Sequence, residues 1–255
     1  MSTWILLRGL TRERRHWGEF PQTLAKELPD SRVVPLELPG NGELNARTSP
    51  STMAGMAAHC HAEVARLGLA PPYRLLAMSM GAMVATAWAE RHPAEIEACV
   101  LINTSFGFLN PLHHRLRPGA WPTLVRLLLA ATPRRREALV FSLTSGCQPP
   151  PPGLIAAWVA IRQSRPVRLA NALRQALGAA RFLPPSRPPV PTLLLASAGD
   201  RLVRAQCSLE IARCWQCPVV LHPTAGHDLP LDDGVWVAKE IGRWLAARPG
   251  LDPSN

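Results

Sequence analysis

The stretch from Tyr73 to Val84 constrains the fold of this chain more than any other. Its first half, residues 73–78, is an apolar run too short for a helix and typical of a strand covered on both faces. Ser79 follows at a predicted sharp turn into a helix. Ala77 and Gly81, two residues before and two after the serine, are small, as a crowded strand-to-helix turn requires. Such a turn lifts the serine hydroxyl off the edge of the sheet towards a reactant.

In the rest of the chain, strand patterns alternate with helix patterns, as a fold that contains this turn requires. Strand and helix patterns follow one another at spacings typical of a parallel sheet with helices on both faces, which predicts an α/β fold. Strands are predicted at 3–7, 33–38, 73–78, 98–102, 190–196 and 218–221, and helices at 17–28, 53–67, 81–91, 205–214 and 234–247.

Residues 105–187 interrupt this rhythm. They contain helical patterns separated by prolines, at about 121–131, 134–143, 154–162 and 167–182, and no evident strand. We therefore predict two parts: an α/β core formed by 1–104 and 188–255, and a helical cap formed by 105–187.

Three polar side chains follow predicted strands, where reactants sit in an open parallel sheet. Ser79 follows the third strand, Asp200 the fifth and His227 the sixth. A serine hydroxyl is a poor nucleophile, so a histidine must take its proton during attack on a carbonyl and return it to the leaving group. An aspartate would hold that imidazole in one tautomer. The sequence therefore predicts Ser79, His227 and Asp200 as a catalytic triad.

Each member of this triad has a simpler alternative. Ser79 could be only a helix N-cap, and Asp200 could only cap the helix after it. Asn103 leaves no acid after the fourth strand, which favours Asp200 as the partner of the histidine. We predict that Asp228, Asp232 and Asp233 shape and cap the start of the last helix.

An ester-cleaving site also needs donors for the oxyanion that develops on the carbonyl. The backbone N–H of Met80, at the start of the helix after the serine, is one candidate. Leu10, directly after Arg8-Gly9 in the loop that follows the first strand, is the other.

With these residues assembled, the chain resembles the α/β-hydrolases over nearly its full length. The matching segments are R-G at 8–9, L-P-G-N-G at 38–42, A-M-S-M-G at 77–81, A-G-D-R-L-V at 198–203 and A-G-H at 225–227. Ala77 stands where the family's nucleophile elbow usually has Gly, and Arg8 where its oxyanion loop usually has His. Size, cap position and elbow are similar to small capped serine carboxylesterases such as the pimeloyl-carrier-protein methyl ester esterases.

The resemblance implies a serine hydrolase that cleaves a carboxylic ester or thioester through an acyl-enzyme. Two alternatives stay open. One is a thioesterase or acyltransferase acting on acyl-carrier-protein or CoA substrates, and the other is a non-catalytic binding protein that kept the fold.

The charge of the chain is concentrated in residues 105–187. This segment holds twelve arginines, no lysine and one acid, Glu137, whereas the rest of the chain has sixteen basic and seventeen acidic residues. Such a surface attracts an acidic carrier protein, a CoA thioester or an anionic ester, or else it is only a solvated face. The candidate binding residues are Arg115, Arg117, Arg134, Arg135 and Arg136.

Other sequence features narrow the range of functions. The apolar run at residues 4–7 is not preceded by the basic segment that a signal peptide has. No apolar run approaches the roughly 20 residues that a membrane span needs. We therefore expect a cytoplasmic protein with reduced cysteines. Cys214-x-x-Cys217 has no second pair at zinc-site spacing, and His61 lies on a predicted helix surface, so neither a metal nor a cofactor is predicted. Nucleic acid is not an expected partner, because no reader motif accompanies the charge.

Overall fold

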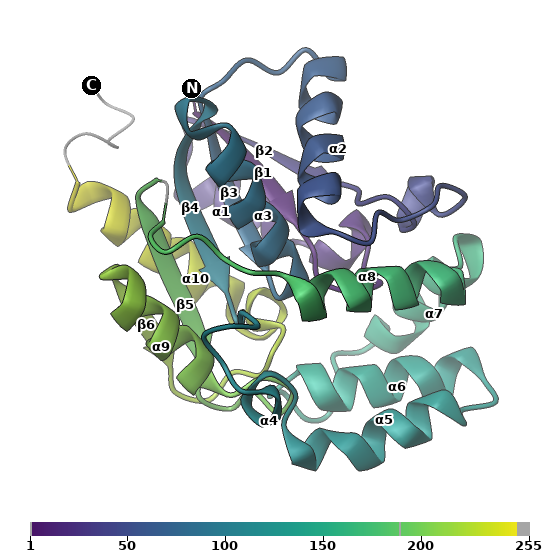
Figure 1. Ribbon diagram of the computed structural model, residues 1–255. Coiled ribbons are helices and arrows are strands. Elements are labelled where there is room, and N and C mark those ends of the chain that lie inside the picture. Colours follow the sequence, from purple (N-terminus) through teal and green to yellow (C-terminus); the bar gives the residue numbers. More distant parts are fainter. Residues whose placement is uncertain (1, 189, 249–255) are drawn as a thin grey trace.

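A computed structural model describes residues 2–188 and 190–248. One six-stranded sheet runs through it in the order β2-β1-β3-β4-β5-β6, and every neighbouring pair is parallel (Figure 1). The predicted six-stranded α/β fold is thus confirmed. The strands are β1 (Ser2–Leu7), β2 (Ser31–Leu36), β3 (Tyr73–Met78), β4 (Ile96–Ile102), β5 (Thr192–Ser197) and β6 (Val219–His222).

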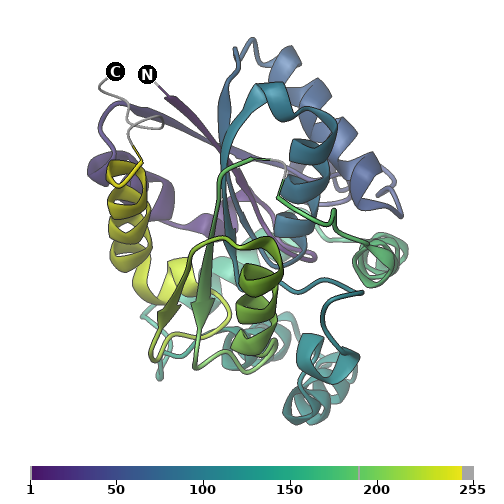
Figure 2. The same ribbon diagram turned by 60° about the vertical axis from the view of Figure 1, so that its left-hand side comes forward.

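Alternation along the strands produces one apolar core on each face of the sheet. In β3, Leu75 and Ala77 join one core, and Leu76 and Met78 join the other. All four are at most 2% exposed, as expected for a central strand with helices on both sides. The first face is covered by α2 (Met53–Arg66), α3 (Met80–Arg91) and α9 (Ala205–Trp215), and the second by α1 (Phe20–Glu27) and α10 (Leu229–Ala246) (Figure 2).

A helical segment, residues 105–187, connects β4 to β5. Its helices are α4 (Leu112–Arg115), α5 (Trp121–Leu128), α6 (Pro133–Thr144), α7 (Leu154–Ser164) and α8 (Leu169–Arg181). The last of these is tied to the loop after β2. Asn171 accepts from the Ser49 N–H at 3.0 Å, and Gln175 donates to Asn41 Oδ1 at 2.9 Å. Both α8 side chains are buried, so these bonds fix α8 over the Pro-Gly-rich turn at 38–42.

The last helix differs from its prediction. It begins at Leu229, five residues before the expected start at 234, and it contains a break at Asp233, whose φ and ψ are −151° and 73°. The acidic pair before Gly234 has the composition of a helix start, and the Asp233 carboxylate does accept the Trp236 N–H at 2.9 Å. However, the helix has already begun before this pair, with Pro230 in its first turn, where the fixed φ of proline favours a helix start. Across 2–188 and 190–248, no helix combines the length and apolar character that a membrane span needs.

Candidate active site

Ser79 occupies a strained turn between β3 and α3. Its φ of 55° and ψ of −122° lie outside the regions that L-residues favour, at a cost of about 1–3 kcal/mol. It stands at the N-cap position of α3, yet its side chain makes no capping hydrogen bond. The simpler N-cap interpretation therefore does not explain this hydroxyl.

The segments around the serine crowd this turn. A Cβ added to Gly81 would lie 2.5 Å from the backbone oxygens of Leu7 and Arg8, so only glycine fits there. A Cβ on Gly9 would lie 3.1 Å from Ser79 Cβ. The loop after β1 thus passes directly beside the serine. In contrast, Ala77 is accommodated in the buried core, which explains why the first small residue need not be glycine.

Asp200 and His227 are joined by a hydrogen bond. His227 Nδ1 lies 2.6 Å from Asp200 Oδ2, and the two side chains are 5% and 1% exposed. The other carboxylate oxygen of Asp200 accepts the backbone N–H groups of Leu202 at 2.7 Å and Val203 at 2.9 Å. Asp200 therefore shapes its own turn and also binds the imidazole. Because an ionised carboxylate only accepts, His227 donates through Nδ1, and Nε2 is left to accept a proton.

The electrostatics of His227 follow from this pair. Burial and the charge of Arg8 lower the pKa of the imidazole, but the charge and hydrogen bond of the Asp200 carboxylate, together with the charge of Asp228, outweigh them. The pKa of His227 is consequently raised above its usual value. An imidazole of this kind is a stronger base than an isolated histidine.

Asn103 holds the histidine loop in place, a role that the sequence did not reveal. It follows β4 with a φ of 45°, and its Nδ2 donates to the His227 backbone oxygen at 2.9 Å and to Ser197 Oγ at 2.9 Å. Its Oδ1 accepts the Ser197 N–H at 2.8 Å. One amide side chain thus links the ends of β4 and β5 to the backbone of His227. The sequence marked this position only as lacking an acid.

Ser79 and His227 line the same cavity, of about 160 Å³, here named the inner cavity. Leu10 lies in its wall and is 40% exposed, whereas Met80 is 2% exposed at the first position of α3. Apolar side chains of the helical segment complete the wall, namely Leu124, Leu127, Val140 and Leu143. The fold thus brings Ser79, His227 and Leu10 to one space, and Asp200 stands behind the histidine.

A buried ion pair connects the two loops of this site. Arg8 donates from both Nη atoms to Asp228, at 3.0 and 2.6 Å, and both side chains are at most 4% exposed. The guanidinium also lies 4.8 Å from the ring centroid of Trp17. Asp228 was predicted to cap the last helix, but it makes no side-chain capping bond there. It instead binds the residue that stands in place of the family's customary histidine.

The predicted binding arginines have different surroundings. Arg115 donates to the backbone oxygen of Ala179, within the helical segment. Arg117 donates to the backbone oxygen of Asp200 and so joins the helical segment to the turn after β5. Their structural bonds explain why they are only partly exposed. The other three belong to α6: Arg134 and Arg135 are exposed, and Arg136 donates from Nε to the Ala130 backbone oxygen at 2.9 Å.

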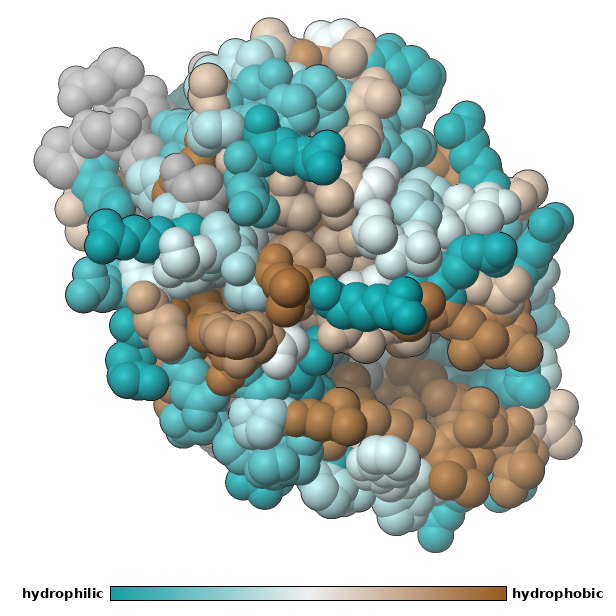
Figure 3. Space-filling model, viewed as in Figure 1, coloured by the Kyte–Doolittle hydropathy of each residue, from teal (hydrophilic) through white to brown (hydrophobic). Residues whose placement is uncertain are grey.

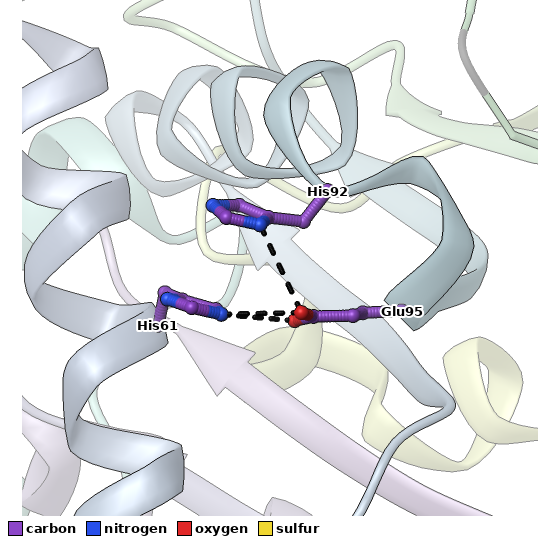
Figure 4. Close-up of side chains that lie close together, drawn as sticks. All are labelled: His61, His92 and Glu95. Atoms are coloured by element: carbon purple, nitrogen blue, oxygen red, sulfur yellow. Dashed lines mark hydrogen bonds and ion pairs between the residues drawn. The ribbon is translucent and has the colours of Figure 1, made fainter.

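A cluster of possible metal ligands lies at the other end of α3, where His61, His92 and Glu95 bring one ligand atom each within 4.8 Å of the others (Figure 4). His61 Nε2 is 3.1 Å from a Glu95 carboxylate oxygen, and the two imidazoles stack with centroids 4.0 Å apart at 11°. A metal ion lies near the plane of an imidazole that binds it. Two parallel stacked planes cannot both meet this condition at one ion, so we interpret the group as a stacked pair beside a carboxylate.

Comparisons with known proteins agree with this architecture. The model of the Alpha/beta hydrolase family matches residues 4–240. No curated protein matches the sequence. Similar solved structures include a thermophilic esterase from Thermogutta terrifontis, with 23% identity, TM-score 0.73 and coverage of 97% of this chain and 90% of that one.

Two further structures carry the same fold. An esterase from Rhodococcus sp. ECU1013 has 20% identity and a TM-score of 0.73, covering 96% of this chain and 90% of its own. The 2-hydroxy-6-oxo-6-phenylhexa-2,4-dienoate hydrolase from Rhodococcus sp. strain RHA1 has 18% identity and a TM-score of 0.76, covering 96% and 89%. At these identities the likeness shows the fold alone, but the family model spans nearly the whole sequence. This chain belongs to the α/β-hydrolase family.

Proposed function

We propose that this protein is a serine hydrolase that cleaves a carboxylic ester or thioester through an acyl-enzyme. The observation that carries the proposal is the inner cavity, which Ser79 and His227 line together while Asp200 binds the far side of the imidazole. Nucleophilic acyl transfer needs a hydroxyl that is not engaged in a capping hydrogen bond, a base and an acid that orients the base.

The proposed reaction has two halves. Ser79 Oγ attacks the carbonyl carbon while His227 Nε2 takes the hydroxyl proton, and Asp200 stabilises the imidazolium. The proton then passes to the leaving alcohol or thiol as the acyl-enzyme forms. Water, activated by His227, releases the acid in the second half. The N–H groups of Leu10 and Met80 bind the oxyanion in both halves.

Residues 105–187 act in this proposal as a cap that forms the acyl pocket. Four of their apolar side chains lie in the wall of the inner cavity, which excludes water around the scissile bond. The likeness to pimeloyl-carrier-protein methyl ester esterases stays a prediction, because neither acyl length nor leaving group follows from these side chains.

Labelling with a fluorophosphonate probe tests the proposal, because the probe phosphonylates an activated serine. We expect a single adduct on Ser79, identified by mass spectrometry of the digested protein, and its loss in His227→Ala, since the base activates the hydroxyl. A folded protein that takes no label at Ser79 would fit the alternative of a non-catalytic binding protein.

The pH dependence of labelling provides a second prediction. His227 must be neutral to accept the proton, and neutral imidazole predominates above its pKa. Because that pKa is raised, we expect the labelling rate to fall with acidification through a midpoint above 6.5, the ordinary histidine value. Asp200→Asn removes the charge that raises the pKa and leaves the burial that lowers it, so its midpoint should lie below that of the wild type. Identical midpoints would contradict the assigned pair.

Action on an acyl-carrier-protein or CoA thioester is the second candidate function. Exposed Arg134 and Arg135 at the start of α6 favour it, because acidic partners are attracted by such a surface. Carrier binding should then weaken steeply with salt and with charge reversal at these two positions.

A further inference from the structure

A second, larger cavity adjoins the inner cavity. This outer cavity has a volume of about 420 Å³. Thr11, Arg12, Leu127 and Arg162 line both spaces, so the two share a wall. In Figure 3 the surface is hollowed between α8 and the helices α5 and α6, and apolar side chains lie along the lower edge of the hollow. The outer cavity is therefore the space next to a substrate whose carbonyl lies at Ser79.

The acids in the wall of the outer cavity are covered by arginines. Glu137 is 0% exposed and is bound by Arg12 Nη1 at 2.8 Å and by Arg162 Nε. Glu13 is 4% exposed and is bound by Arg15 at 2.5 Å. Neither carboxylate is open to a molecule in the cavity. Glu137 offsets one of the two charges of Arg12 and Arg162, so one positive charge remains on that group.

The cations are placed differently. Arg162 lines the cavity, is 32% exposed and bonds Glu137 through Nε, so its two Nη atoms take no part in that bond. Arg136 is exposed and uses Nε for a backbone oxygen. Arg165 also lines the cavity, but it is paired with Glu43 at 3.0 Å. Arg136 and Arg162 are therefore the two guanidinium groups best placed to bind an anion there.

The same cavity is apolar between its charged groups. Leu127 lies in the shared wall, and Leu128 and Leu169 form the rim, where they are 76% and 71% exposed. Burial of a carbon chain against these leucines is favourable at about 25 cal/mol per Å². The outer cavity thus combines an apolar path from the serine with a cationic end.

We infer that the substrate of Ser79 carries a carboxylate beyond its scissile ester and that Arg162 and Arg136 bind this carboxylate in the outer cavity. Guanidinium groups bind carboxylates through paired N–H donors, and both arginines are fixed at Nε by bonds within the protein. The inference rests on the proposed hydrolase activity and adds the chemical class of its substrate.

Two chromogenic substrates of equal carbon number test the inference: p-nitrophenyl hexanoate and the p-nitrophenyl half-ester of adipic acid, which differ in the terminal carboxylate. The measured quantity is the ratio of kcat/KM for the anionic ester to that for the neutral one. We expect Arg162→Gln and Arg136→Gln each to lower this ratio about tenfold, the scale of one charge-assisted hydrogen bond partly open to water. A third ester, 3-carboxy-4-nitrophenyl hexanoate, carries the charge on the leaving group and tells which side of the ester lies in the outer cavity.

Arg126→Gln and Arg174→Gln are matched controls in the helical segment, because each removes one exposed positive charge without lining either cavity. Their ratios should stay at the wild-type value. Raising sodium chloride to about 0.5 M should lower the wild-type ratio as well, since it screens a half-open ion pair.

The possible failures are separable. If the ratio is the same in wild type, Arg162→Gln and Arg136→Gln for both anionic esters while all are hydrolysed, the carboxylate site is wrong and the hydrolase stands. If no ester is hydrolysed through Ser79, the proposed function itself is wrong. If Arg162→Gln unfolds through loss of its bond to Glu137, Arg136→Gln is the variant that tests the site, because within residues 2–188 and 190–248 the Arg136 side chain bonds a backbone oxygen and no acid.

Discussion

Replacing Ser79 by alanine is expected to lower kcat for short p-nitrophenyl esters by about four to six orders of magnitude. Removing the nucleophile of a serine hydrolase leaves only substrate binding and the oxyanion donors, which accounts for losses of that size. The fold should survive, because the Ser79 side chain makes no capping bond and is only partly buried. Rates and thermal unfolding of the same preparation check both statements.

A matched serine provides the control. Ser31 begins β2 at the edge of the sheet, where its hydroxyl lies 3.2 Å from that of Ser2. Ser31→Ala should keep the wild-type rate. Turnover by Ser79→Ala at the rate of the Ser31 variant would remove the nucleophile assignment and with it the proposed acyl-enzyme.

Breaking the ion pair between Arg8 and Asp228 is expected to cost about 3–5 kcal/mol of unfolding free energy. Both side chains are almost fully buried, so removing one leaves the other as an uncompensated charge inside the protein. Arg8→Gln and Asp228→Asn should each show this loss in urea unfolding. Activity should fall too, because Arg8 precedes the loop beside Ser79, and Asp228 follows His227.

A double variant and a control variant test this explanation. Arg8→Met combined with Asp228→Leu leaves no buried charge and should recover most of the lost stability. Arg66→Gln breaks a surface ion pair in which Arg66 is 68% exposed and Glu63 23%, and it should cost only a small fraction of the loss expected at Arg8. A loss at Arg8 no larger than that at Arg66 would show that the pair does not hold the two loops.

Local sequence patterns were sufficient for the elements of the sheet. The apolar run of β3, the small residues around Ser79 and the alternating patterns predicted six strands close to their observed bounds. Successive side chains of a strand point to opposite faces of the sheet, and this alternation is a property of the chain itself. The prediction of the last helix was less accurate, since the helix already begins at Leu229 with Pro230 in its first turn, before the acidic pair.

The contacts around the candidate site were harder to predict from the sequence. Asn103 was noted only as a missing acid, yet its amide holds the backbone of His227. The Arg8 and Asp228 pair joins positions 220 residues apart, and nothing in either segment marks the other as its partner. Glu137 was counted among the charges of the helical segment, whereas it lies buried between two arginines.

The sequence by itself determined the order of strands and helices, the tight turn at Ser79 and the residue types available after β3, β5 and β6, because these depend on local sterics and on the periodicity of apolar residues. Only the tertiary structure decided which polar groups face one another. Pairing across long sequence separations depends on the packing of loops from different strands, and that packing set the Arg8–Asp228 pair, the contacts of Asn103 and the covering of Glu137. The charge of residues 105–187 is therefore a property of composition, but the placement of Arg136 and Arg162 at the outer cavity is a property of the fold.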